Sequence, residues 1–108
     1  MGSENRRYVV VVSDEARQML VSHVRFLAQI NESAAMRLVE VFEEKAKSLE
    51  QFPERNPWLV DPLIPPGKYR KLLLEKRYLL IYWVRESTVY VDAIVDTRQD
   101  YGWLLGTS

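Results

Sequence analysis

The sequence predicts an α+β fold: an N-terminal strand, an antiparallel helical hairpin and then a three-stranded antiparallel meander, with the helices packed on one sheet face. Three observations predict it. Two adjacent segments carry apolar residues at helical spacing, three later segments have strand-like apolar patterns, and the connections within each half are only a few residues long. With 108 residues, 47% of them hydrophobic, the chain has the size of one globular domain, residues 1–108.

The first strand is predicted at residues 8–12, a valine-rich run that follows a polar start. We expect this strand to be buried on both faces or flanked by neighbours. It stops at Ser13 and Asp14, which supply a good N-cap for a helix. The strand should therefore pass directly into the first helix.

The first helix is predicted from Asp14 to about Gln29, and its apolar face is unusually wide. The centre of this face contains Ala16, Leu20, Val24, Leu27 and Ala28, and Met19, His23, Phe26 and Ile30 widen it. One interpretation is that the centre packs on the sheet and leaves a shoulder for a second surface, either the second helix or a partner. We interpret His23, the single histidine, as a buried and hydrogen-bonded core residue.

The second helix is predicted to begin after a new N-cap within residues 31–33 and to continue to about Gln51. Its apolar stripe is narrower and consists of Ala35, Leu38, Val39, Phe42, Ala46 and Leu49. The charged residues on its other faces are interpreted as a solvated surface. Because the break between the helices is so short, they should form an antiparallel hairpin.

A long, stiffened loop is predicted at residues 53–67. It contains Pro53, Pro57, Pro62, Pro65 and Pro66, and proline lacks the backbone donor that helices and inner strands require. The loop also carries Trp58, Leu59, Val60, Leu63 and Ile64, which are too apolar for a free linker. We expect these side chains to pin the loop against the domain; the alternative is a partner-binding loop.

Three strands are predicted at residues 69–74, 78–84 and 89–96, joined by connections of hairpin size. In residues 78–84 both alternating sets are apolar, which is typical of a central strand covered on both sides. In residues 89–96 one set is apolar and the other is mixed, so we expect one core face and one face open to water or a ligand.

Composition excludes several classes of function. The chain has no cysteine, no segment of about 20 apolar residues and no signal-peptide pattern, which favours a cytoplasmic protein without a membrane span. The sequence shows no Gly-rich phosphate loop, paired carboxylates or cluster of metal ligands, so we expect no cofactor and no metal. The formal net charge is zero, but residues 68–98 carry seven basic and four acidic side chains. The excess positive charge therefore lies in the sheet half.

The order of these elements, together with two segments, resembles the RelE/ParE superfamily of toxins from bacterial type II toxin–antitoxin modules. The first segment is KYRKLLLEKRYLLIYWV, residues 68–84, with a basic strand followed by Tyr78 and Tyr82; the second is AIVDTRQDYGWLL, residues 93–105. The resemblance covers essentially the whole chain. It implies a toxin that arrests growth either by ribosome-dependent mRNA cleavage or by blocking DNA gyrase. It also implies a cognate antitoxin, and both a homodimer and a toxin–antitoxin hetero-oligomer are compatible with it.

The resemblance transfers only part of a ribonuclease site to this sequence. Arg70 takes the position of the first basic residue of the family's basic strand, but the second falls on Leu72 and an arginine of the next strand falls on Leu79. Arg98 matches the arginine after the last strand, and Tyr101 lies near the family's C-terminal tyrosine. The implied catalytic residues are Arg70, Arg98 and Tyr101, with Lys71, Arg77 and Arg85 as RNA-binding residues. The competing interpretation is a non-catalytic protein-binding module, either a gyrase inhibitor or an inactive orphan.

Overall fold

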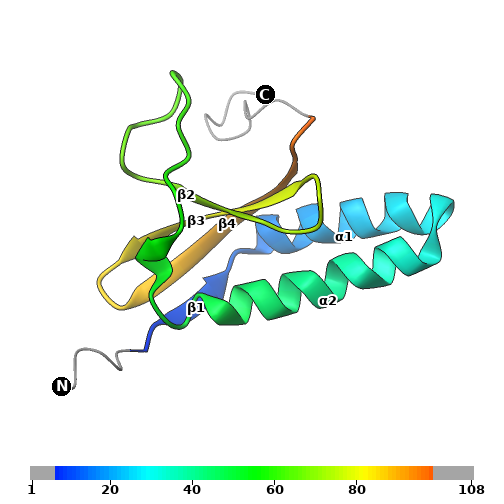
Figure 1. Ribbon diagram of the computed structural model, residues 1–108, viewed down its shortest axis with the longest axis horizontal. Coiled ribbons are helices and arrows are strands. Elements are labelled where there is room, and N and C mark those ends of the chain that lie inside the picture. The colour runs from blue at the N-terminus through cyan, green and yellow to red at the C-terminus, as the bar shows by residue number, and fades with distance from the viewer. Residues whose placement is uncertain (1–6, 99–108) are drawn as a thin grey trace.

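The computed structural model describes residues 7–98, and in it a four-stranded sheet carries two long helices on one face (Figure 1). The elements are β1 (Val9–Val12), α1 (Asp14–Ile30), α2 (Glu32–Ser48), the 3-10 turn η2 (Pro53–Arg55), β2 (Arg70–Leu73), β3 (Tyr78–Arg85) and β4 (Thr88–Asp96). The predicted α+β order of strand, two helices and three strands is confirmed. Within the described residues, no helix is both long and apolar enough to cross a membrane.

The strands lie in the order β1-β4-β3-β2, and β1 pairs with β4 in parallel while the other pairs are antiparallel. The helical hairpin serves as the long crossover that a parallel pairing requires. β1 is thus an edge strand, and its outer side chains Val9 and Val11 are 63% and 43% exposed. The expectation that this strand is buried on both faces or flanked by neighbours was wrong, because a run of valines does not distinguish an edge strand from a central one.

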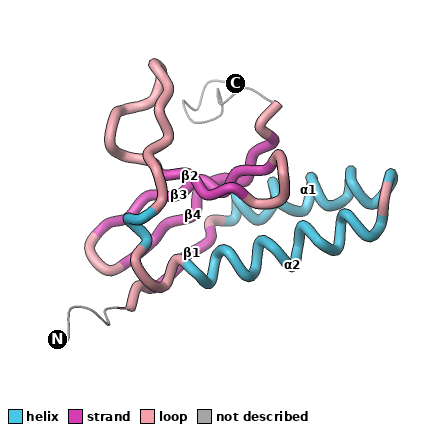
Figure 2. Tube along the Cα trace, viewed as in Figure 1, coloured by secondary structure: helices cyan, strands magenta, loops and turns pink. Residues whose placement is uncertain are grey.

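The helical hairpin owes its tight turn to Asn31. The backbone N–H of Asn31 donates to the Leu27 carbonyl at the end of α1, and its side-chain oxygen accepts from the Ala34 N–H at the start of α2. Ser13 caps α1 in the same way, since its hydroxyl accepts from the Ala16 N–H. In Figure 2 the two helices run side by side, and the end of the hairpin projects past the strands.

The sheet is covered on both faces. On the helix face, residues from α1 and α2 pack against Leu80, Tyr82, Val89 and Val91, all fully buried. On the opposite face, Leu59 and Ile64 of the loop at residues 53–67 pack against Leu79, Ile81, Ala93 and Val95. The prediction of a two-sided central strand is therefore confirmed. Loop pinning is confirmed for Leu59 and Ile64 alone, since Trp58, Val60 and Leu63 are 42%, 85% and 64% exposed.

A β-bulge in β4 changes which side chains face the helices. Ile81 pairs with Ala93 and Tyr82 pairs with Val91, so Asp92 is an extra residue without a partner position on β3. Val91 therefore packs on the helix face, whereas Ala93 packs on the loop face. The prediction of one core face along residues 89–96 was wrong, because a bulge interrupts the period of two on which it relied.

Candidate functional site

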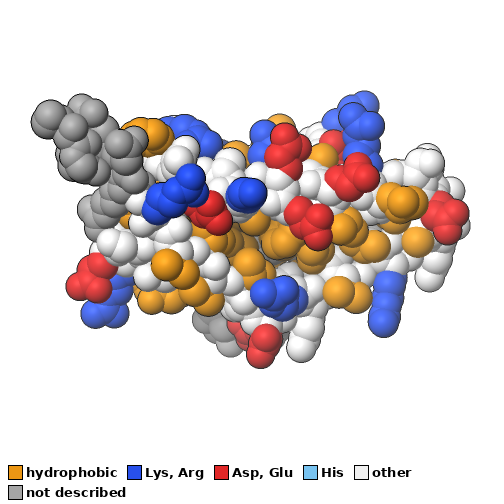
Figure 3. Space-filling model, turned by 90° about the horizontal axis from the view of Figure 1, so that it is seen from below, with side chains coloured by type: hydrophobic (Ala, Val, Ile, Leu, Met, Phe, Trp, Pro, Cys, Tyr) orange, Lys and Arg blue, Asp and Glu red, His pale blue; other side chains and the backbone are white. Residues whose placement is uncertain are grey.

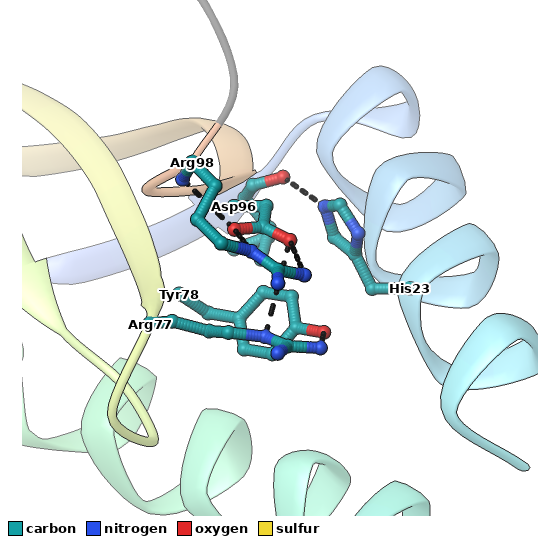
Figure 4. A network of polar contacts seen from close by, with 6 residues as sticks. His23, Arg77, Tyr78, Asp96 and Arg98 are labelled. Carbon is teal, nitrogen blue, oxygen red and sulfur yellow. Dashed lines mark hydrogen bonds and ion pairs between the residues drawn. The ribbon is translucent and has the colours of Figure 1, made fainter. Parts of the chain in front are cut away.

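Asp96, the last residue of β4, binds two arginines. Its carboxylate accepts from the backbone N–H of Arg98 at 2.9 Å, and from Nε and Nη2 of the same residue at 3.4 and 3.3 Å. Nε of Arg77, the residue before β3, lies 3.9 Å from Oδ2 of Asp96, the oxygen that Nη2 of Arg98 also contacts. Figure 4 shows both guanidinium groups next to the one carboxylate. The end of the sheet therefore carries two positive charges around one nearly buried negative charge.

The electrostatic balance keeps Asp96 ionised. Burial acts to raise the pKa of this carboxyl, but the hydrogen bonds from Arg98 and the charges of Arg98 and Arg77 outweigh it and lower the pKa. The Asp96 side chain is 10% exposed and that of Arg98 is 63% exposed. The carboxylate thus acts from inside the protein to orient a cation that faces solvent.

His23 of α1 faces this cluster. Its Nε2 lies 2.8 Å from the Ile94 carbonyl oxygen, and because a carbonyl only accepts, Nε2 carries the hydrogen and donates. The His23 ring lies 5.0 Å from the Tyr78 ring. The hydrogen bond agrees with the expected core histidine, but the side chain is only half-buried and lies beside Asp96, which its position in the sequence did not indicate.

A half-open cavity of about 440 Å³ lies between α1 and the end of β4. Its lining consists of Met19, Ser22, His23, Phe26, Tyr78, Asp96 and Arg98. We call this the α1–β4 cavity. It combines an apolar floor with hydrogen-bond donors, and the described residues contain no group of acidic or histidine side chains that could hold a metal ion. The charged groups of its lining are the carboxylate of Asp96 and the exposed guanidinium of Arg98, which can contact an anionic group.

Arg70 lies elsewhere and holds the loop. Its Nη1 donates to the Asn56 carbonyl at 2.7 Å, and its guanidinium carbon lies 3.6 Å from the centre of the Trp58 ring. Arg70 pairs with Tyr82, whereas Asp96 pairs with Tyr78 four residues earlier in β3. The structure therefore brings Arg77 and Arg98 together and separates both from Arg70.

The remaining predicted site residues are dispersed. Lys71 lies on the edge strand β2, where it pairs with Ile81 and is half-buried, and Arg85 is exposed at the far end of β3. Tyr101 lies outside the described residues. Leu72 and Leu79, which take positions where the resemblance implied cations, belong to the two hydrophobic cores. Asp96 was missed as a site residue; the available signal was its spacing of two residues from Arg98 at the end of a strand.

The chain matches the family model described as "ParE toxin of type II toxin-antitoxin system, parDE" over residues 10–101. Among solved structures, it is similar to a chain of the "Chromosomal ParDE TA system from P. aeruginosa". That likeness has a TM-score of 0.67 at 19% sequence identity, and it covers 84% of this chain and 97% of the other. It shows a shared fold. A search of curated protein sequences found no match.

Proposed function

We propose that this chain, which belongs to the ParE toxin family of type II toxin–antitoxin systems, arrests growth by binding DNA gyrase and is neutralised by a cognate antitoxin. In this proposal it acts in the cytoplasm, as one subunit of a toxin–antitoxin hetero-oligomer when the antitoxin is present. Its effect on gyrase requires binding and no bond cleavage by the toxin itself.

The observation that carries the proposal is that the predicted cation positions do not form one cationic site. Arg70 is committed to the loop through the Asn56 carbonyl and the Trp58 ring, and Leu72 and Leu79 are packed in the cores. Cleavage of RNA needs several cations and a proton-transfer group around one phosphate. Of the proposed cationic residues, Arg77 and Arg98 alone share one partner, and that partner is a carboxylate.

Exposed apolar side chains on the helical hairpin support binding to protein. Val21, Phe26, Ile30 and Met36 are between 47% and 68% exposed. Figure 3, the view from below, shows hydrophobic side chains in a band between charged ones. Apolar surface bordered by polar residues is typical of protein interaction sites. The name of the similar ParDE structure supports an antitoxin as one such partner.

Two assays on the purified chain test the target. The first follows supercoiling of relaxed plasmid by gyrase, and the second maps ribosome-bound mRNA ends by toeprinting. We expect inhibition of supercoiling without new mRNA ends. New ends in the presence of ribosomes, with supercoiling unchanged, would show that the gyrase proposal is wrong.

Ribosome-dependent mRNA cleavage is the second candidate. The shared contact of Arg77 and Arg98 with Asp96 favours it, because two guanidinium groups near each other are suited to a phosphate. The toeprint assay separates the candidates by variant. If cleavage occurs, Arg98→Gln should remove it, while Lys47→Gln, which removes an exposed positive charge on α2, should leave it unchanged.

The antitoxin part of the proposal has its own test. The gene next to the one for this chain is coexpressed with a tagged form of the toxin, and growth and copurification are measured. A stable complex that restores growth is expected. Growth arrest that persists in spite of a well-expressed neighbouring protein would contradict neutralisation by that protein.

A further inference from the structure

We propose that the α1–β4 cavity is a binding site for a mononucleotide, with the phosphate at Arg98 and the base against Phe26, and with the charge of Arg77 next to the cavity. This inference goes beyond gyrase inhibition and antitoxin binding, neither of which requires a small phosphate ligand. It rests on the shape of one helix face, on the arrangement of two arginines around a carboxylate, and on an exposed aromatic ring beside them.

The helix face is the shoulder that makes the apolar side of α1 unusually wide. Met19, Ser22, His23 and Phe26 are spaced three and four residues apart, so they lie on one side of the helix. All four line the α1–β4 cavity. The shoulder is therefore turned toward β4 and Tyr78, and a cavity remains where a helix packed tightly on a sheet would leave none.

The carboxylate of Asp96 holds the guanidinium group of Arg98 in place at the cavity. Arg98 uses Nε and Nη2 for Asp96, and a guanidinium group has five N–H donors, so three N–H donors of Arg98 are not used on Asp96. Arg98 is 63% exposed, so these donors are accessible to a ligand. Arg77 brings a second guanidinium to the same carboxylate. The guanidinium group of Arg98, held in one orientation, is well suited to the oxygens of a phosphate, and Arg77 adds positive charge beside the cavity without lining it.

Asp96 is a positioning residue in this arrangement. It is 10% exposed, lies next to the guanidinium of Arg98 and lines the cavity with it, so its charge is paired with a cation at the surface that a ligand would meet (Figure 4). One negative charge between two positive charges leaves a local surplus of one. The site therefore attracts an anion and at the same time fixes the direction from which the anion is bound.

The remaining walls suit a flat apolar group. Phe26 is 53% exposed, and aromatic rings stack on nucleobases of any sequence. Met19 adds a polarizable side chain to the same lining. The hydrogen bond to Ile94 fixes the His23 ring next to Tyr78. The volume of about 440 Å³ lies in the range of small-ligand sites, about 300–1,000 Å³.

The test uses His23 as an internal reporter, because it is the single histidine in the chain and lines the cavity. The imidazole NMR signals of the full-length protein are followed during titrations with AMP, inorganic phosphate and adenosine. We expect AMP to shift these signals in a saturable way. Phosphate should bind more weakly than AMP because it lacks a base, and adenosine should not shift the signals because it lacks the phosphate.

Three variants locate the site. Arg98→Gln should weaken AMP binding by about tenfold or more, while Lys47→Gln, with the same loss of charge on the exposed face of α2, should bind as wild type does. Phe26→Ala should reduce the preference for AMP over phosphate and leave phosphate binding unchanged. A circular dichroism spectrum of each variant checks that it is folded, and the wild-type titration tests the proposal even if a variant does not fold.

Several results would overturn the proposal: no shift of the His23 signals at millimolar AMP, equal shifts with adenosine and AMP, or equal losses in Arg98→Gln and Lys47→Gln. The last of these would indicate nonspecific attraction to positive charge. The titrations contain no gyrase and no antitoxin, so their failure leaves the proposed function standing, and failure of gyrase inhibition leaves the nucleotide site standing.

Discussion

Arg98 donates to the carboxylate of Asp96 from its backbone N–H at 2.9 Å and from its guanidinium group at 3.3 and 3.4 Å, across a separation of two residues in the chain. The backbone bond is a local turn of the kind that aspartate often forms. It bends the chain where β4 ends, and the guanidinium contacts then hold Arg98 at the mouth of the α1–β4 cavity. One carboxylate thus shapes both the end of the sheet and the position of a cation.

Asp96 should make the protein sensitive to acid. Its pKa is lowered in the folded state by Arg98 and Arg77 in spite of burial, so its ionised form contributes stability above its unfolded pKa of about 3.9. This contribution is lost as the pH falls through the lower, folded pKa. In urea unfolding series between about pH 7 and pH 2, Asp96→Asn should be less stable at neutral pH, by about 1 kcal/mol, and should lose less on acidification. Glu40→Gln, on the exposed face of α2, is the control; an equal pH dependence in both variants would contradict the role of Asp96.

Asp92, the extra residue of the bulge, should behave with the opposite sign. Burial raises the pKa of this carboxyl. The hydrogen bond from the Trp83 indole N–H, 3.0 Å from Oδ2, and the charge of Lys68 lower the pKa, but by less. Stability from the neutral form is present below the unfolded pKa and is lost as the pH rises through the folded pKa. Asp92→Asn should therefore stabilise the protein at about pH 7, by less than about 1 kcal/mol, and the gain should shrink toward about pH 4. A lower urea midpoint for this variant at neutral pH would refute the prediction.

Leu59 should be the main anchor of the loop at residues 53–67. It is 3% exposed and packs on the loop face of the sheet, so Leu59→Ala should cost about 2–5 kcal/mol. Leu63→Ala removes the same atoms from a side chain that is 64% exposed, and it should cost less than about 0.5 kcal/mol. Chemical denaturation of the two variants gives the comparison. Equal costs would mean that the loop does not depend on its buried leucine.

The fold could be predicted from the sequence where one pattern determined one structure. The two helices have strong periodicity and capping residues, and the doubly apolar strand β3 requires cover on both faces. The edge position of β1 and the bulge at Asp92 could not be predicted, because both depend on which strands pair. For the site, Arg98 could be identified from its place after the last strand. The approach of His23 to Asp96 could not, since 73 positions in the chain separate them and only the packing of α1 on β4 unites them.

Tyr82 should link the loop to the sheet through its hydroxyl group. This buried hydroxyl donates to the Pro53 carbonyl and accepts from the Asn56 amide, whose backbone carbonyl in turn accepts from Arg70. Tyr82→Phe keeps the ring but leaves the Pro53 carbonyl without this donor, so it should cost about 1–3 kcal/mol in urea unfolding. Tyr90→Phe changes a half-buried tyrosine on the neighbouring strand β4; it is the control and should have a smaller effect. If both variants unfold at the same urea concentration, the hydroxyl group does not connect the loop to the core.

The turn between β3 and β4 should be improved by glycine at a single position. Arg85 pairs with Thr88, so the turn has two central residues, and the first of them, Glu86, has a φ of 56°. Two-residue hairpin turns require a positive φ that side chains disfavour, which is why glycine or asparagine is usual there. Glu86 is exposed, so its replacement loses no packing. Glu86→Gly should therefore raise the stability by about 0.5–1 kcal/mol, after the greater entropy of unfolded glycine is subtracted from the relieved strain.

Ser87→Gly gains no such relief, because Ser87 is not among the described residues with positive φ, and it should be destabilising. Thermal unfolding of both variants measures the difference, and stabilisation by Ser87→Gly but not by Glu86→Gly would show that the strain lies elsewhere in the turn.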